Sequence, residues 1–168
     1  MEPTLQQDRI GQRQAQWRKE LPDLDTRGMA VLGRARWITL AARPRIESLF
    51  AEHGLDAGEF DVLATLLRGG APYSQRPTEL FRSLMISSGG LTDRLLRLEK
   101  AGWVQRIPCP DDARSKRVQL TEAGRNLTEE LFRRDMALEA EMLAALSEAE
   151  VTALSDLLAK LAASLETD

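Results

Sequence analysis

The sequence predicts a mostly α-helical chain with one small β-hairpin wing, arranged as a winged helix-turn-helix with helical extensions at both ends. Three observations support this fold class. Residues 88–101 form a short helical pattern with a serine- and glycine-rich start and a leucine ridge. A polar turn with prolines and cations, residues 108–117, follows within a β-leaning stretch. Apolar stripes at three- and four-residue steps lie toward both ends of the chain.

The composition narrows the class of protein. The 168 residues are enough for one domain with helical extensions. The single cysteine cannot form an internal disulfide, which fits the reducing cytoplasm, and one His with one Cys gives no metal-ligand spacing. Neither a secretory leader nor an apolar run long enough for a membrane is evident. We therefore expect a cytoplasmic protein without metal, cofactor or membrane contact.

The net charge of −3 conceals an uneven distribution. Residues 76–118 contain nine basic and five acidic residues, a net charge of +4. Residues 129–168 contain ten acidic and three basic residues, a net charge of −7. A basic middle segment beside an acidic tail indicates a protein that meets a polyanion with one side, although two solvated faces would give the same pattern.

Helical patterns occupy the N-terminal part. A helix is predicted over residues 3–20, because Ile10 and Trp17 recur on one face. A longer helix runs to His53, and Pro44 inside it is expected to kink or divide it.

Three short helices come next and match a helix-turn-helix core. The first starts at Asp56 or Ala57, the second has Pro77 at its first position, and the third covers residues 88–101.

A hairpin and two helices complete the chain. Trp103 to Ile107 and Lys116 to Leu120 are the predicted hairpin strands. Thr121 is expected to cap a helix that extends through Leu146, and Ser147 to cap the last helix.

We therefore predict three regions. Residues 1–54 form N-terminal helices for dimerisation and hold a candidate ligand site. Residues 55–121 form the winged helix-turn-helix, and residues 122–168 form C-terminal dimerisation helices. The apolar faces of the terminal helices need a partner, and a second copy of the chain supplies one. A two-fold dimer also matches a palindromic site in double-stranded DNA.

The helix 88–101 divides into two faces. Leu91, Leu95 and Leu98 share one face and are expected to pack in the core. Small residues at the tip let a helix N-terminus approach phosphates, and hydroxyls and guanidinium groups can contact base edges. The predicted DNA contacts of this segment are Ser87, Ser88, Gly89, Thr92 and Arg97.

The predicted wing adds three cations, Arg114, Lys116 and Arg117. Arginine is favoured in narrow, electronegative minor grooves, so these side chains are also predicted to contact DNA. An ordinary exposed charged hairpin would have the same composition.

Four linked motifs resemble the MarR family of transcriptional regulators. They are Pro77-Thr78-Glu79-Leu80, the segment from Ser87 to Gly102, Asp111-Asp112-Ala113-Arg114-Ser115, and Leu120-Thr121-Glu122-Ala123-Gly124. The resemblance spans roughly residues 30–165. It implies a homodimer that binds palindromic operators through a winged helix and, usually, repression relieved by a small ligand.

A narrower resemblance links the chain to the urate-responsive PecS-type subgroup of that family. It rests on Trp17, Pro22-Asp23-Leu24-Asp25, the segment from Glu59 to Leu63, and Gly70-Ala71-Pro72-Tyr73. The resemblance implies a small anionic effector such as urate, held by Trp17, Asp61, Arg94 and Arg106. An aromatic plane stacks on a purine and arginines pair with its oxygens. The alternative is a structural Asp61–Arg94 salt bridge with Trp17 as packing.

Other functions remain open at this point. Cys109, taken as a surface thiol with Arg106 nearby, is a candidate oxidant sensor. A winged-helix protein–protein module is a second alternative. Such a module would be expected to lack the basic middle segment. An enzyme is not expected, because the chain lacks nucleophile motifs, phosphate-binding glycine loops and an evident acid–base pair.

Overall fold

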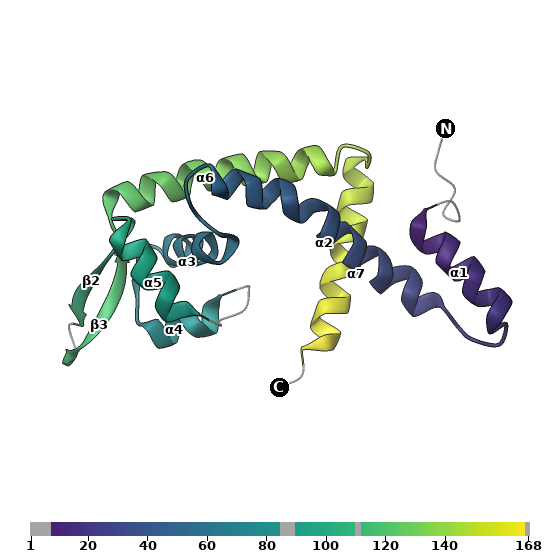
Figure 1. Cartoon of the computed structure of the whole chain (residues 1–168), viewed down its shortest axis with the longest axis horizontal. Helices are drawn as coiled ribbons and strands as arrows, with labels where there is room; N and C mark the ends of the chain where they lie inside the picture. The colour runs from purple at the N-terminus through teal and green to yellow at the C-terminus, as the bar shows by residue number, and fades with distance from the viewer. Residues whose placement is uncertain (1–7, 85–89, 110–111, 167–168) are drawn as a thin grey trace. The chain divides into compact units, whose positions relative to one another are not determined.

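The computed structural model describes residues 8–84, 90–109 and 112–166. The chain divides into two compact units, residues 1–45 and 46–168. The described residues form seven α-helices and a three-stranded antiparallel sheet (Figure 1), the mostly helical winged-helix fold that the sequence predicts. None of the described helices is both long and apolar enough to span a membrane.

The first unit contains α1 (Arg9–Glu20) and most of α2 (Arg27–Ala51). Asp8 begins α1 by accepting a hydrogen bond from the backbone N–H of Gly11 at 2.7 Å. The same carboxylate accepts two hydrogen bonds from Arg34 of α2, both at 2.9 Å. One side chain therefore both caps α1 and ties it to α2.

Pro44 does not divide α2. Of the two outcomes expected, a kink or a division of the helix, the division is therefore wrong. The helix continues from Arg27 to Ala51 with Pro44 inside it. A proline removes one hydrogen bond and crowds one carbonyl, and a helix with several turns on each side can absorb that cost. The boundary between the two compact units nevertheless lies close behind Pro44, between Arg45 and Ile46.

The core of the second unit lies among α3 (Ala57–Arg68), α4 (Pro77–Ser83), α5 (Leu91–Lys100) and α6 (Glu122–Met142). α3 begins at Ala57, one of the two predicted starts, and its N-cap Asp56 forms a reciprocal capping box with Glu59. The most deeply buried apolar side chains of the core are Val62, Leu63, Leu66, Leu80, Leu98, Val118 and Leu131.

The sheet is larger than the predicted hairpin. Strands β2 (Val104–Cys109) and β3 (Asp112–Leu120) pair in antiparallel fashion, and both extend further toward the turn than expected. A short third strand, β1 (Ser74–Gln75), pairs with the other edge of β3, so the order is β1-β3-β2. Two residues are too few for an alternating pattern, which is why the sequence does not predict β1.

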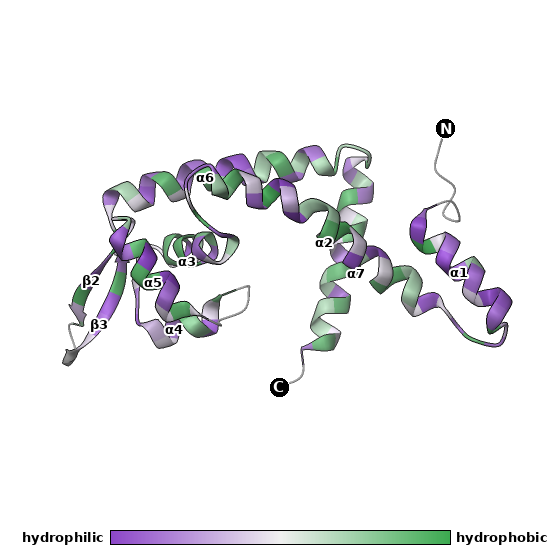
Figure 2. Ribbon diagram, in the orientation of Figure 1, coloured by the Kyte–Doolittle hydropathy of each residue, from purple (hydrophilic) through white to green (hydrophobic). Residues whose placement is uncertain are grey.

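The last two helices begin where the sequence predicts. Thr121 accepts a hydrogen bond from the backbone N–H of Gly124 at 2.9 Å at the start of α6, and Ser147 caps α7 (Glu148–Leu165). α6 ends at Met142 rather than at Leu146. Figure 2 shows apolar residues along α7, and no described residue of this helix is buried. Leu157, for example, is 67% exposed.

Candidate nucleic-acid interface

α5 has the two faces that its sequence predicts. Leu91, Leu95 and Leu98 are buried, and Leu95 is only 2% exposed. Asp93 and Leu96 lie on the opposite side and are exposed, and Thr92 is exposed on the flank. The helix is thus anchored by a narrow leucine ridge and leaves a mixed polar and apolar face uncovered.

The start of α5 depends on a glycine. Gly90 occupies the N-cap position with φ of 75°, a left-handed conformation that side chains other than glycine adopt only at a cost. The helix therefore begins at Leu91, later than the predicted residue 88. Ser87, Ser88 and Gly89, predicted to contact DNA, lie outside the described residues.

Arg97 is held against α3 rather than projecting freely from the exposed face. Its Nε donates a hydrogen bond to Glu59 Oε1 at 2.5 Å, and its Nη2 donates to Asp56 Oδ2 at 3.1 Å. The hydrogen bond to Glu59 raises the pKa of Arg97. Arg97 follows Arg94 by three residues, so both arginines lie on the α5 flank that faces the start of α3. The side chain remains 54% exposed.

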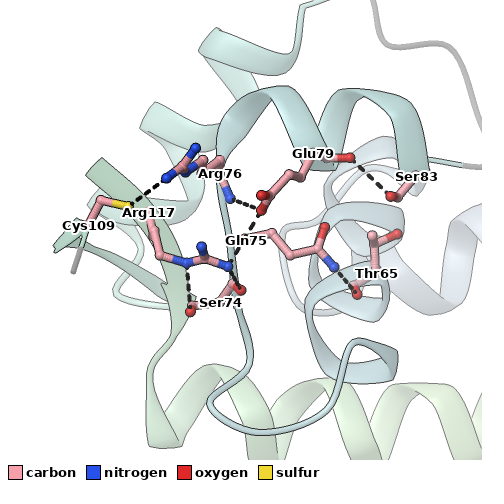
Figure 3. Close-up of polar contacts among 8 residues, drawn as sticks. All are labelled: Thr65, Ser74, Gln75, Arg76, Glu79, Ser83, Cys109 and Arg117. Carbon is pink, nitrogen blue, oxygen red and sulfur yellow. Dashed lines mark hydrogen bonds and ion pairs between the residues drawn. The ribbon is translucent and has the colours of Figure 1, made fainter. Parts of the chain in front are cut away.

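The wing cations lie in different environments. Arg114 is part of β3, and Lys116 of the same strand is exposed. Arg117 is turned inward: its Nη2 donates to the backbone oxygen of Ser74 at 2.8 Å, and its Nε donates to the Ser74 hydroxyl at 3.2 Å. Arg117 Nη2 also lies 3.5 Å from Glu79 Oε2 (Figure 3). Arg117 thus fastens β3 to β1 and to the start of α4.

Glu79 joins the wing to the helix-turn-helix. Its Oε2 accepts a hydrogen bond from the backbone N–H of Arg76 at 2.7 Å, which closes the first turn of α4 (Figure 3). The same oxygen faces Arg117 of the wing. The contact with Arg117 is not predicted from the sequence, although an acidic residue three positions after a helix cap is a recognisable signal for the capping bond.

Cys109 is not a surface residue, which corrects the sequence-based expectation. It is 3% exposed and ends β2 with its Sγ 3.2 Å from Arg76 Nη2 (Figure 3). The end of β2 therefore lies against Arg76, the residue before α4. This is a tertiary contact that local sequence does not reveal.

The four predicted ligand residues occupy several elements. The Arg94 guanidinium packs against Gly58 near the start of α3, with its Nε 3.9 Å from Asp56 Oδ1. Arg106 on β2 has its Nε 3.7 Å from Glu99 Oε2 at the end of α5. Asp61 lines a cavity between α3 and α6. Trp17 belongs to the first unit, on α1.

Comparisons with known proteins agree with this architecture. The family model described as the MarR family matches residues 55–116. The HTH-type transcriptional regulator PecS of Dickeya dadantii is 41% identical over 145 residues, covering 86% of this chain and 87% of that protein. The multiple antibiotic resistance protein MarR of Salmonella typhimurium is 31% identical over 132 residues, covering 77% and 90% of the two chains.

A solved structure shares both fold and sequence. The crystal structure of a mutant MarR from E. coli complexed with operator DNA superposes with a TM-score of 0.66 at 27% identity, covering 86% of this chain and 96% of that one. The similarity to proteins of this kind confirms a DNA-binding regulator rather than an enzyme. The chain belongs to the MarR family of winged helix-turn-helix transcriptional regulators.

Proposed function

We propose that this protein is a homodimeric repressor that binds a palindromic operator in double-stranded DNA through α5 and the wing. The observation that carries the proposal is the exposed face of α5, opposite its buried leucine ridge. A Thr92 hydroxyl can hydrogen-bond base edges or phosphates, and Leu96 can contact the methyl group of thymine. Ser87, Ser88 and Gly89 would meet the same groove from the segment before α5.

The cations of the interface have two different roles in this proposal. Lys116, exposed on β3, contacts phosphate, and Arg114 of the same strand enters the adjacent minor groove. Arg97 and Arg117 are positioning residues, because their guanidinium groups already bond to carboxylate or backbone oxygens of the protein. They hold α5 and the wing at the angle that DNA requires.

The apolar terminal helices supply the dimer interface. Large apolar side chains are exposed on α2 and α7, among them Val31, Ile38, Leu154, Leu157 and Leu158. Several large apolar side chains exposed on one helix indicate an interaction site, and each of the two helices carries such side chains. Sedimentation equilibrium is expected to give twice the chain mass, and a Leu154→Glu, Leu158→Glu double variant is expected to shift the equilibrium toward monomer.

Salt dependence of DNA binding tests the two roles of the cations. Operator fragments are first selected from the genome of the source organism, and affinity is then measured by fluorescence anisotropy at several salt concentrations. Lys116→Ala is expected to weaken binding and to reduce the slope of log K against log salt by about 1.

Arg117→Ala is expected to weaken binding with an unchanged slope, and Ser74→Ala to reproduce part of this loss. Lys160→Ala, on α7, is the control for loss of a positive charge. A slope reduced by Arg117→Ala as much as by Lys116→Ala would assign Arg117 to a phosphate contact. A winged-helix protein–protein module would select no DNA and show no steep salt dependence.

The effector is proposed to be a small anion such as urate, bound by Trp17, Asp61, Arg94 and Arg106. Two facts support this proposal: Arg94 is a residue of α5, and its guanidinium packs on the start of α3. An anion that attracted Arg94 would compete with Asp56 and thereby act on the helix that binds DNA. The alternative, a structural role of Arg94 toward α3, leaves DNA binding insensitive to urate.

A urate titration of the protein–operator complex in a gel mobility assay distinguishes these alternatives. Release is expected in the micromolar to millimolar range, and Arg94→Ala is expected to require a higher urate concentration. The ligand proposal fails if urate releases no DNA or releases the Arg94→Ala variant equally well.

Oxidant sensing through Cys109 is the second candidate mechanism, favoured by one contact. Arg76 Nη2 lies 3.2 Å from Cys109 Sγ, and a guanidinium this close would interact with an oxidised, anionic sulfur, although burial restricts access of an oxidant. Peroxide is expected to release DNA from the native protein and not from Cys109→Ser. Equal release from both proteins excludes this mechanism.

A further inference from the structure

The exposed face of α5 carries an acidic side chain. Asp93, Leu96 and Lys100 follow one another at positions i, i+3 and i+7, so they form one stripe opposite the buried leucine ridge. All three side chains are exposed, and Asp93 lies in the first turn of the helix. In helix-turn-helix proteins, the helix that enters the major groove contacts base edges with its N-terminal residues. A carboxylate therefore stands at the end of α5 that is closest to the bases.

The fold does not use the Asp93 carboxylate as it uses the equivalent acids of other helices. Glu59 of α3, Glu79 of α4 and Glu150 of α7 each lie three residues after the N-cap, and each accepts the N-cap backbone N–H, at 2.8, 2.7 and 2.8 Å. Asp93 has the same position after Gly90. Within the described part of the chain, however, its carboxylate closes no capping box and forms no ion pair.

The nearest cation on the helix does not bond to Asp93 either. Arg97, one turn further along, donates hydrogen bonds to Glu59 at 2.5 Å and to Asp56 at 3.1 Å. The hydrogen bond to Glu59 raises the pKa of Arg97 most, and the charge of Asp93 adds least. The contribution of Asp93 to folding is therefore limited to weak attraction by Arg97 and by the helix N-terminus. Its carboxylate is available to a molecule that contacts this face.

A carboxylate on a DNA-binding face interacts favourably with few atoms of the duplex. It repels the phosphates, and an ionised carboxylate can only accept hydrogen bonds. The donors in the major groove are the amino groups at N4 of cytosine and N6 of adenine. Adenine presents the acceptor N7 beside N6, which repels a carboxylate, whereas cytosine presents N4 without such a neighbour.

We propose that Asp93 is a specificity-determining residue, whose carboxylate accepts a hydrogen bond from the N4 amino group of a cytosine in each operator half-site. This inference rests on the proposed function, because it takes α5 as the helix that enters the groove. A thymine at the same place would present its O4 oxygen to the carboxylate, and two acceptors repel each other. Asp93 therefore lowers the affinity for DNA in general and raises the preference for one sequence.

Selection from a random-sequence duplex library, followed by fluorescence anisotropy, tests this role. The native protein defines an operator, and each C·G pair of one half-site is then replaced in turn by T·A. One such replacement is expected to weaken native binding about tenfold. Asp93→Ala is expected to bind that duplex and the operator with affinities within about twofold of each other, because the carboxylate that distinguishes the two bases is removed.

Binding to a scrambled duplex of the same composition is the second measurement. Asp93→Asn removes a negative charge that repels phosphates, so the scrambled duplex is expected to bind a few-fold more tightly. Operator affinity is expected to fall, so that the ratio of the two affinities drops about tenfold or more. Glu122→Gln, which changes an exposed acid in the first turn of α6, is the matched control and is expected to leave this ratio unchanged.

A purely structural role of Asp93 would lower both affinities in parallel and would leave the cost of each C·G replacement as in the native protein. That result overturns the role of Asp93 and leaves the operator proposal intact. An operator in which every C·G replacement costs the native protein less than about twofold has the same meaning. If the native protein selects no duplex at all, the operator proposal fails, and the role of Asp93 fails with it.

Discussion

The carboxyl groups that border the two sides of α3 differ in their hydrogen-bond partners. Toward α5, Asp56 and Glu59 form the capping box of α3 and bond to Arg97. On the other side, Asp135 of α6 faces a cavity, and its Oδ1 accepts no hydrogen bond within the described part of the chain. One side of α3 therefore fixes the position of α5, whereas the other borders a buried carboxylate that lowers stability. In proteins, such uncompensated groups are concentrated at binding sites.

The largest expected difference between the two sides concerns packing. Leu95→Ala removes a side chain that is buried in the α5 ridge, and we expect a loss of about 2 to 5 kcal/mol in the free energy of unfolding. Met136→Ala enlarges a cavity that already exists and is expected to cost about 1 kcal/mol or less. Urea denaturation followed by circular dichroism measures both. Equal losses would show that the α6 side is packed as tightly as the α5 side.

The ion pairs on the α5 side are expected to contribute less. Glu59→Ala removes the partner of Arg97 and one half of the α3 capping box, which together are worth about 1 to 2 kcal/mol of unfolding free energy. DNA affinity is also expected to fall, because Arg97 no longer fixes α5 against α3. Glu129→Ala, which removes an exposed i,i+4 pair with Arg125, is the control and is expected to change stability by less than about 0.5 kcal/mol. A similar loss in both variants would contradict the special position of Glu59.

The smallest expected effect is a pH dependence from the α6 side. The folded-state pKa of Asp135 is raised, so the unfolded chain releases this proton first as the pH rises from the ordinary value of 3.8. Unfolding free energy therefore falls through that interval up to the raised pKa, and the loss persists at higher pH. Comparing Asp135→Asn with the native chain isolates this group, because both proteins keep the other charged residues around the cavity, Asp61, Arg68 and Glu139. Denaturation at a series of pH values is expected to show a shallower decline for the variant, and parallel curves would refute the assignment.

Periodicity and capping chemistry predicted most of the second unit. The leucine ridge of α5, the start of α3 at Ala57, and the caps Thr121 and Ser147 are local patterns, and the structure confirms each of them. Local sequence does not determine how far a long side chain reaches. The sequence predicts a DNA contact for Arg97, which stays a prediction, but it does not reveal that the guanidinium also bonds to carboxylates 38 and 41 residues away in sequence.

Features that depend on the juxtaposition of distant elements could not be predicted. Burial of Cys109 follows from the end of β2 lying against the segment before α4, and β1 is too short to show a pattern. The cavity exists only because α3 and α6 pack together, so the sequence does not indicate that Asp135 lines one. The α5 contacts, the ligand residues and the dimer stay predictions for the experiments above.

Glu79 has a mechanical consequence for the way the wing communicates. A single carboxylate oxygen accepts the amide that starts α4 and faces the guanidinium of Arg117 in β3. The first turn of α4 and strand β3 are therefore joined through one oxygen atom. We expect a displacement of β3 to shift the first turn of α4, and a change that loosens α4 to shift β3.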